Sequence, residues 1–365
     1  MKPIYSLALA IIGSATTVSL QSPKAQAITF NITSTGNSQA DAGFNRAANL
    51  WGNQFTDPVT IKIDAGFSTL DPGVLGQASS TQGTVSYNAT ATALNADITS
   101  NDDFTATDNL PEGDSFDLWI NRTANNPNGS GNATPYLDDD GDANNSTISM
   151  TTANAKALGL LASNNGPDQD AKITFSDRFD WDFDPSDGIE SGAFDFTAVA
   201  AHEIGHAMGF ISGVDILDIN SPNQDGSYFN DDEFTFVSPL DLYRYSDDSI
   251  DNDALDWTAD DREKFFSIDG GTTSLGTFST GVNYGDGRQA SHWKDNEQLG
   301  LMDPTFAPGE QGVVTDLDLQ AFDVIGWDRT NATPVPFDIP QSFGGLALLG
   351  FIYTRYRRKI NKTKS

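Results

Sequence analysis

The chain contains no cysteine, and it is poor in basic residues and in histidine. Without cysteine it can form no disulfide bonds, so we expect its stability to come from a large core and from bound ions. Against 20 Lys and Arg there are 51 Asp and Glu, which gives a net charge of −31. An acidic surface of this kind repels phosphate backbones and argues against nucleic acid as a partner. Most of these acids are expected to form a solvated surface.

Both ends of the chain lack acidic residues, since none occurs before Ile28 or after Pro340. The amino-terminal end combines Lys2, an apolar run from Ile4 to Ile12 and an Ala-Gln-Ala cleavage site. This pattern is typical of a secretory signal peptide that covers residues 1–27. We therefore expect an exported protein, and export without cysteine fits a bacterium better than the eukaryotic secretory pathway.

The carboxy-terminal segment, residues 331–365, has a layout of its own. A proline-containing stretch, PVPFDIP, is followed by an apolar run from Phe343 to Tyr353 and then by a cluster of Arg and Lys. The apolar run is shorter than the roughly 20 residues that span a bilayer comfortably. The layout resembles the sorting signals of the PEP-CTERM type, which implies an exosortase-like processing partner and a transient membrane anchor; an ordinary single-span anchor is the alternative. We expect membrane contact only through this tail, and a product that is extracellular or held at the cell surface.

Between these ends, residues 28–330 predict an α+β fold in which helices pack on a sheet. Strands are predicted where apolar residues alternate or cluster, and helices where they recur at three- and four-residue spacing. The expected strands are ITFNIT from residue 28, VTIKIDAGF from residue 59, GTVSYNA near Val85, FDLWINR near Leu118 and KITFS from residue 172; the expected helices cover residues 39–55, 152–161, 196–208 and 316–325. The stretch 210–287 is rich in Asp, Ser, Asn and Gly and indicates a folded insertion, with a helix-like segment DDREKFFSI at 260–268.

The most specific feature is the run HEIGHAMGF, His202 to Phe210. On a helix, residues four apart share one face, so His202 and His206 point the same way with Glu203 beside them. Two imidazoles at this spacing are ligands for zinc, and the carboxylate can act as a base. A chance occurrence in a structural helix is the alternative, but the chain has three histidines and two of them fall at ligand spacing.

A hydrolytic zinc ion needs a third protein ligand, and the sequence offers several candidates. Glu233 is the first Glu downstream, but its surroundings, NDDEFTF, indicate a loop or strand. In the compact pattern HExxHxxGxxH the last position is Ser212, which cannot replace a histidine, and Asp215 comes three residues late. His292 remains, with Met302 ten residues further on.

Three matches together resemble the leishmanolysin branch of the metzincin zinc proteases. They are HExxHxxGF at His202 to Phe210, HW at His292 and Trp293, and LM at Leu301 and Met302. The resemblance implies a zincin-like twisted mixed sheet with the active-site helix in an amino-terminal catalytic subdomain, residues 28–209. It further implies a carboxy-terminal subdomain, residues 210–330, that carries a long insertion, the third ligand and a Met-turn.

The same resemblance implies a role for each matched residue in a zinc-dependent endopeptidase. His202, His206 and His292 are implied to be the metal ligands, and Glu203 the general base. Gly209 is implied to make a sharp turn and Met302 to form a hydrophobic floor. The resemblance also implies an edge strand near Ile173 to Ser176, along which a protein or peptide substrate lies extended.

Two features depart from that family or leave a second interpretation open. Leishmanolysins carry many disulfides and a propeptide cysteine that blocks the zinc, and neither can be carried over to a chain without cysteine. A bacterial relative with a different form of latency is therefore expected. The alternative is a non-catalytic, surface-displayed adhesive or structural protein with a zincin fold, although the intact Glu203 favours an enzyme.

Two loops dense in Asp are candidates for other roles. Asp138, Asp140 and Asp142 alternate as calcium ligands do, but the glycine at 141 is misplaced for an EF-hand loop. The loop FDWDFDPSDG, from Phe179, precedes the active-site helix and is either a rim of the cleft or a solvated turn.

Overall fold

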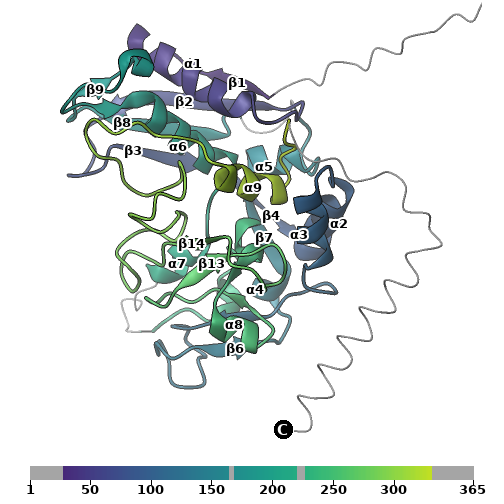
Figure 1. The fold of residues 1–365 in the computed structure, drawn as a ribbon. Coiled ribbons are helices and arrows are strands. Elements are labelled where there is room, and N and C mark those ends of the chain that lie inside the picture. The colour runs from purple at the N-terminus through teal and green to yellow at the C-terminus, as the bar shows by residue number, and fades with distance from the viewer. Residues whose placement is uncertain (1–27, 164–167, 220–226, 331–365) are drawn as a thin grey trace, which may run out of the picture.

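The computed structural model describes residues 28–163, 168–219 and 227–330 (Figure 1). The expected signal peptide and carboxy-terminal tail lie outside the described residues. The described chain is α+β, as the sequence predicts, with helices and several small sheets. The largest sheet and two long helices form the upper part in Figure 1, and short strands, helices and loops form the lower part.

The largest sheet has four strands in the order β1-β2-β8-β3, which are Thr29–Ile32, Thr60–Ser68, Ala171–Ser176 and Gly76–Ser80. The first three run parallel, and β3 runs antiparallel to β8. The prediction that Ile173 to Ser176 form an edge strand is therefore wrong, because β8 lies between β2 and β3. Its side chains are buried on both faces, as expected for an interior strand. The two edge strands are β1 and β3, and β3 has the sequence GQASS, which carries no apolar pattern.

Helices α1 (Ser38–Gly52) and α6 (Phe196–Met208) pack against each other and against the sheet. Phe175 of β8 makes ring contacts with Phe44 of α1 and Phe196 of α6, with centroids 5.3 and 4.5 Å apart. Trp51 of α1 donates its indole N–H to the carbonyl of Ala201 in α6 over 2.8 Å. These buried aromatic contacts fix the position of α6 relative to the sheet.

The chain between β3 and β8 forms a group of short elements. They are β4 (Gln82–Ser86), α2 (Tyr87–Ala96), α3 (Asn101–Asp108), β5 (Leu118–Ile120), β6 (Tyr136–Asp138), α4 (Ala143–Ser146), β7 (Thr147–Thr151) and α5 (Thr152–Ala157). The strands predicted near Val85 and Leu118 are confirmed. The first ends at Ser86, because the Ser86 hydroxyl accepts from Ala89 N and begins α2. The helix predicted for residues 152–161 ends earlier, at Ala157.

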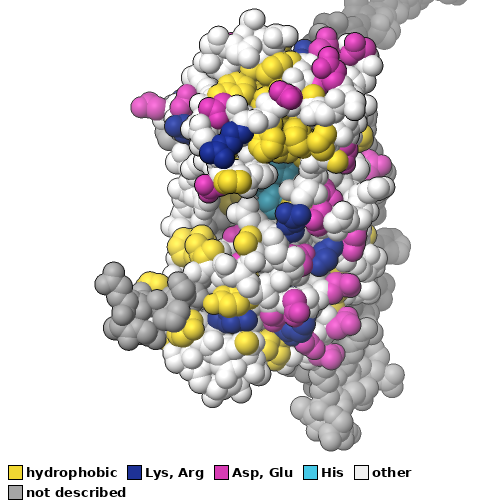
Figure 2. Space-filling model, turned by 90° about the vertical axis from the view of Figure 1, so that its left-hand side faces the viewer, with side chains coloured by type: hydrophobic (Ala, Val, Ile, Leu, Met, Phe, Trp, Pro, Cys, Tyr) yellow, Lys and Arg dark blue, Asp and Glu magenta, His cyan; other side chains and the backbone are white. Residues whose placement is uncertain are grey.

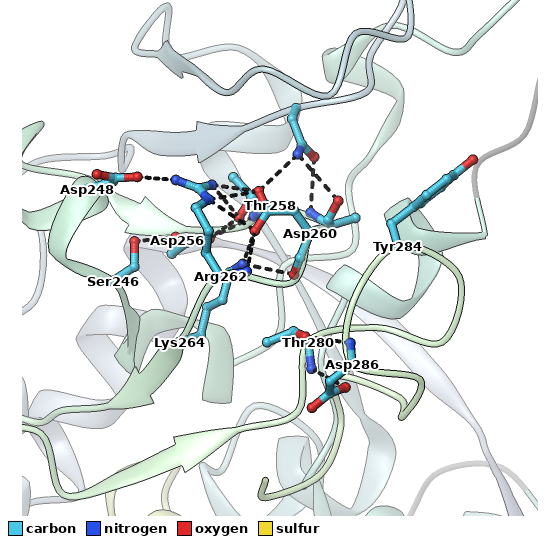
Figure 3. Close-up of polar contacts among 12 residues, drawn as sticks. Ser246, Asp248, Asp256, Thr258, Asp260, Arg262, Lys264, Thr280, Tyr284 and Asp286 are labelled. Carbon is cyan, nitrogen blue, oxygen red and sulfur yellow. Dashed lines mark hydrogen bonds and ion pairs between the residues drawn. The ribbon is translucent and has the colours of Figure 1, made fainter.

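The elements around and after α6 are also short. They are β9 (Trp181–Asp182), β10 (Phe194–Asp195), α7 (Val214–Asp218), β11 (Arg244–Tyr245), α8 (Asp247–Asp251), β12 (Leu255–Asp256), β13 (Lys264–Phe266) and β14 (Gly276–Phe278), with 3-10 turns at Pro185–Asp187, Asp231–Glu233 and Leu240–Tyr243. The helix predicted within residues 260–268 is wrong, because β13 is the central strand of a three-stranded sheet. Arg262 and Lys264 both bind Asp260 (Figure 3), and this ion-pair network holds the segment extended.

The last helix, α9 (Asp316–Val324), confirms the prediction for residues 316–325, and the chain after it returns to the first helix. Arg329 pairs with Phe55 in an isolated antiparallel β-bridge, and Thr330 N donates to the carbonyl of Gln54 over 2.7 Å. The indole N–H of Trp327 donates to the carbonyl of Met208 at the end of α6. Across residues 28–330, apart from the two undescribed gaps, no helix has the length and apolar character needed to cross a membrane.

Candidate metal centre

Three histidine side chains meet between the upper and lower parts of the molecule. The Nε2 atoms of His202, His206 and His292 form a triangle with sides of 3.1, 3.2 and 3.2 Å. Tetrahedral zinc, with Zn–N bonds of about 2.0–2.1 Å, places its nitrogen ligands about 3.3–3.4 Å apart. Within the described residues, no other three His, Cys, Asp or Glu side chains bring their ligand atoms within 4.8 Å of one another. The three histidines could therefore hold a metal ion.

The second nitrogen of each ring faces a backbone carbonyl. His202 Nδ1 lies 2.9 Å from Leu301 O, His206 Nδ1 2.7 Å from Phe210 O, and His292 Nδ1 3.2 Å from Gln289 O. Because a carbonyl can only accept, each Nδ1 carries the hydrogen, and the lone pairs of the three Nε2 atoms converge. This tautomer is the one a metal ion requires.

Burial keeps the three rings neutral. It lowers the pKa of His202 to about 3 and that of His206 to about 4, and it moves the pKa of His292 well below its usual range. The proximity of the rings to one another lowers the pKa of His202 and His292 further. A neutral imidazole is the form that binds a metal, so at neutral pH no proton competes for these nitrogens.

The local sequence explains why α6 presents two of these rings together. The Asp195 carboxylate accepts from Ala198 N over 2.9 Å and caps the start of the helix. Gly209 ends the helix with a φ of 126°, a left-handed conformation that side chains disfavour. Phe210, directly after this turn, supplies the carbonyl that His206 needs.

The helix that follows, α7, positions the segment that carries the distant His292. The Asp215 carboxylate accepts from Ala290 N over 2.6 Å and from the Ser291 hydroxyl. Ser212 N donates to Ser291 Oγ over 2.9 Å. Ser212 and Asp215 were candidates for the third ligand by sequence spacing, and the structure instead places both of them against the residue next to His292.

Met302 is fully buried and packs against Gly205 of α6. A Cβ added to Gly205 would come within 2.5 Å of Met302 Sδ, so the glycine inside HEIGH is what allows this close approach. The Met302 carbonyl accepts from Trp293 N over 3.0 Å, which joins the Met302 turn to the segment of His292.

Asp318, in the first turn of α9, holds both of these segments. Its carboxylate accepts from Leu301 N over 2.7 Å, from Met302 N over 3.3 Å and from the indole N–H of Trp293 over 2.8 Å. The Leu301 carbonyl is the partner of His202, and Trp293 follows His292 in the chain. Asp318 therefore helps to position both histidines through these neighbours.

Glu203 points toward the edge strand β3. Its carboxylate accepts a hydrogen bond from the backbone N–H of Ala78, and a Cβ added to Gly76 would lie 2.9 Å from Glu203 Oε1. Burial raises the pKa of Glu203 to about 8, and the Ala78 N–H partly opposes this effect. An acid with such a pKa can take up and release a proton near neutral pH.

The centre is open to solvent on one side. Figure 2 shows histidine surface in a hollow at mid-height, below a hydrophobic patch. The chain has three histidines, so this surface belongs to the metal centre. The ring of Phe306 stands edge-on to His202 with centroids 6.0 Å apart.

Other candidates from the sequence lie elsewhere. Asp138, Asp140 and Asp142 do not bring their three carboxylates within 4.8 Å of one another. Asp138 is buried and accepts from the Asn144 amide over 2.8 Å, whereas Asp140 is exposed. Glu233 is exposed in a 3-10 turn, where its carboxylate accepts from Asn230 N.

The sequence did not indicate that Asp318, Asp215 and Gly76 support the centre, although Asp215 was considered as a ligand. Asp318 and Asp215 act on backbone groups, and no spacing pattern announces such a partner. Gly76 lies in a strand without apolar alternation. The sequence around Asp318 has one recognisable pattern, because Thr315-Asp316-Leu317-Asp318 at the start of α9 has the Thr-x-x-Asp form of a helix cap. Helix capping alone explains an aspartate at this position, so the pattern did not point to the metal centre.

Comparison with known proteins places the chain in no family: no protein-family model matches it, and no curated protein and no solved structure is found similar to it.

Proposed function

We propose that this protein is an exported zinc-dependent endopeptidase with a metzincin-type centre, related to the leishmanolysin branch. The convergence of three Nε2 lone pairs, with the carboxylate of Glu203 beside them, carries the proposal. Three histidines leave one position of a tetrahedral zinc ion for water, which is the ligand set of a catalytic rather than a structural site. The buried Met302 and the turn at Gly209 are consistent with this class.

Bound zinc would polarise the substrate carbonyl and lower the pKa of a bound water to about 7. Glu203 is placed to take the proton of the attacking water and to deliver it to the leaving amine. The N–H of Ala78 holds the carboxylate of Glu203 in position while it carries the charge.

The substrate site follows from the corrected sheet order. β3 is an edge strand and its residues 76 and 78 touch Glu203, so an extended peptide that pairs with β3 would pass the catalytic carboxylate. The hydrophobic patch above the histidines in Figure 2 would receive apolar side chains of such a peptide.

The test compares Glu203→Gln with His292→Ala in the full chain. Glu203→Gln should retain zinc at about one ion per chain by elemental analysis and should lower casein or peptide-library cleavage by at least about 1,000-fold, because the base is lost while the ligands remain. His292→Ala should lose both zinc and cleavage. Equal cleavage by the parent and Glu203→Gln would show that the protein is no zinc peptidase of this kind.

The second candidate is a surface-displayed adhesive or structural protein that keeps the metal centre without turnover. In that case the parent would bind zinc and cleave no member of a broad peptide library, and the two variants would differ in zinc content alone. The buried carboxylate of Glu203 beside the histidines favours the enzyme, because a structural zinc site has no use for a further carboxylate that is not a ligand.

Export and processing of the tail by an exosortase-like enzyme are further proposals, which rest on residues 1–27 and 331–365. Removal of the residues after Ala332 should release the protein into the medium without a surface-held stage. A cell-associated fraction that is unchanged by the truncation would contradict this proposal.

A further inference from the structure

One arginine, Arg288, stands close to the metal centre on the segment that carries the third histidine. Ser279 N donates to the His292 carbonyl over 3.0 Å, and Gly281 N donates to the Arg288 carbonyl over 2.9 Å. The two stretches run antiparallel, as the isolated β-bridge between Gly281 and Arg288 shows. Arg288 and His292 therefore lie on one arm of the same loop, four residues apart.

A single hydrogen bond holds the side chain of Arg288 beside the metal centre. Arg288 Nε donates to Asp295 Oδ2 over 2.9 Å, and Asp295 Oδ1 accepts from the Thr305 hydroxyl over 2.8 Å. Thr305 precedes Phe306, whose ring lies edge-on to His202 with centroids 6.0 Å apart. The guanidinium group is therefore linked to the turn whose next residue contacts a metal ligand.

Most of the hydrogen-bonding capacity of Arg288 is unused. A guanidinium group has five N–H donors, and within the described part of the chain the side chain of Arg288 donates only through Nε. The side chain is 44% exposed, whereas that of Asp295 is 15% exposed and has both oxygens occupied. The fork formed by Nη1 and Nη2 is therefore available to a carboxylate, which it would bind with two parallel hydrogen bonds.

The hollow that exposes the histidines has positive charge at its rim. Figure 2 shows Lys or Arg surface next to the histidine surface. Burial and the neighbouring rings lower the pKa of His292 most, and the positive charge of Arg288 lowers it further, so Arg288 is close enough to act on the centre. On a chain with a net charge of −31, this rim is a local exception. A substrate in the hollow would therefore meet a base beside the metal centre.

The next base along the chain, Lys294, is used within the protein. Its Nζ donates to Asp286 Oδ2 over 2.8 Å, and Asp286 Oδ1 accepts from Thr280 N over 3.1 Å and from Arg288 N over 3.2 Å. Lys294 therefore helps to fix the loop from which Arg288 projects. Arg288 is the base of this loop that has donors to spare.

We propose that Arg288 binds a carboxylate of the substrate and gives the endopeptidase a preference for peptides with an acidic group near the scissile bond. The inference rests on the proposed function, because the ligand is the peptide that the metal centre would cleave. The carboxylate belongs either to a Glu or Asp side chain or to the end of a peptide, since both present the same planar group to Nη1 and Nη2. β3 would supply backbone pairing, which is independent of sequence, and Arg288 would supply the selection by charge.

The test uses the full chain and matched peptides. Each position of an amidated peptide that the parent cleaves is occupied in turn by Glu or by its neutral isostere Gln, and kcat/KM is measured for every pair. At the position that meets Arg288, the kcat/KM of the Glu peptide should be about 5-fold above that of the Gln peptide, and Arg288→Gln should bring this ratio to about 1. The difference should lie mainly in KM, because the contact is made before the reaction as well as during it.

A second series separates the two sources of the carboxylate. The same peptide is shortened stepwise from its carboxy-terminal end and offered with a free or an amidated end. A preference for the free end in the parent that is absent in Arg288→Gln assigns the contact to an α-carboxylate. A preference confined to Glu within the peptide assigns it to a side chain, and either result supports the proposal.

The matched control is Lys172→Gln, which also removes one exposed positive charge. Lys172 lies in β8, and because alternate residues of a strand point to opposite faces, its side chain is on the face away from Phe175 and α6. The Glu-to-Gln ratios of this control should equal those of the parent.

The possible results separate a specific contact from a structural effect. Arg288→Gln should keep the zinc content of the parent and lose only the preference. An equal loss of kcat/KM on both members of each peptide pair would overturn the proposal, as would a parent that shows no preference for a carboxylate. A parent that cleaves no peptide would contradict the proposed function itself, and this inference with it.

Discussion

Aspartate side chains accept hydrogen bonds from backbone N–H groups at several points of this protein. Asp318 holds Leu301 and Met302, Asp215 holds Ala290, and Asp218 accepts from Asn283 N and Tyr284 N over 2.8 and 2.9 Å. Hydrogen bonds to an ionised acceptor are shorter and stronger than those to a neutral one. The acidic composition therefore serves the interior around the metal centre as well as the solvated surface.

At the scale of single residues, Asp318→Asn should weaken zinc binding by about 10–100-fold. The amide would bring an NH₂ donor toward N–H groups that now share a carboxylate, which would displace Leu301 and with it the partner of His202. Competition with a chromophoric chelator measures the affinity. Asp316→Asn is the matched control, because that residue lies in the same turn of α9 with a side chain 96% exposed. Unchanged zinc affinity in Asp318→Asn, even with a lower Tm, would contradict a positioning role.

The convergence of the three histidines could be predicted from the sequence, but the residues that support them could not. His202 and His206 share a helical spacing, and His292 was the one histidine left over. The partners of these ligands are backbone carbonyls of Leu301, Phe210 and Gln289, and every residue has a carbonyl. Such supports are decided by tertiary packing, so a sequence pattern cannot single them out.

At the scale of elements, the edge strand β3 is the feature that sequence patterns missed. Helix α6 was predicted with its exact bounds, because a cap, an alanine-rich interior and a terminal glycine all agree. β3 has small and polar residues throughout, and its strand conformation comes from pairing with β8. The helix predicted for residues 260–268 was wrong for a related reason. The charged side chains of this segment form ion pairs with one another and do not line a solvated helix face.

The absence of a side chain at Gly76 of β3 leaves room for Glu203, and Gly76→Ala tests this. The new Cβ would lie 2.9 Å from Glu203 Oε1 and 3.3 Å from Val199 Cγ1, and β3 is fixed by its pairing with Phe175. We expect the displaced Glu203 to lower kcat by about 10–100-fold, with zinc content unchanged and a stability loss of about 1–2 kcal/mol from overpacking.

The control for this prediction is Gly66→Ala, in β2 of the same sheet. A Cβ there meets nothing within 4 Å, so kcat should be unchanged. If both variants lose activity alike, or if Gly76→Ala retains full kcat, Glu203 is not held against β3 as the structure indicates.

At the scale of the whole molecule, the end of the described chain closes the fold. Arg329 forms a β-bridge with Phe55, Trp327 donates to the carbonyl of Met208 at the end of α6, and Asp328 N donates to Asp57. Asp57, Asp97, Asp323 and Asp328 lie at this closure.

The same closure predicts how stability depends on pH. Burial and neighbouring carboxylates raise the folded pKa values of Asp57, Asp97 and Asp323 to about 8, 9 and 7, above the unfolded values near 4. Between these limits the folded state binds more protons, so the free energy of unfolding decreases as the pH rises. This contribution is complete below about pH 4, decreases as the pH rises above that value, and is lost once the pH has passed through the folded pKa values of about 7 to 9.

Groups with lowered pKa values act in the opposite direction, but in a different range. Hydrogen bonds and ion pairs lower the pKa of Asp260 and Asp286, so their contribution is present above about pH 4 and is lost in acid. We therefore expect the Tm of the protein to be highest near pH 5–6 and to decrease steadily to pH 9. Scanning calorimetry with the Glu203→Gln chain measures this. In Asp97→Asn the decrease should be shallower, since one of the titrating groups is gone. A Tm that is constant or rises between pH 6 and pH 9 would show that Asp57, Asp97 and Asp323 bind no additional protons in the folded state.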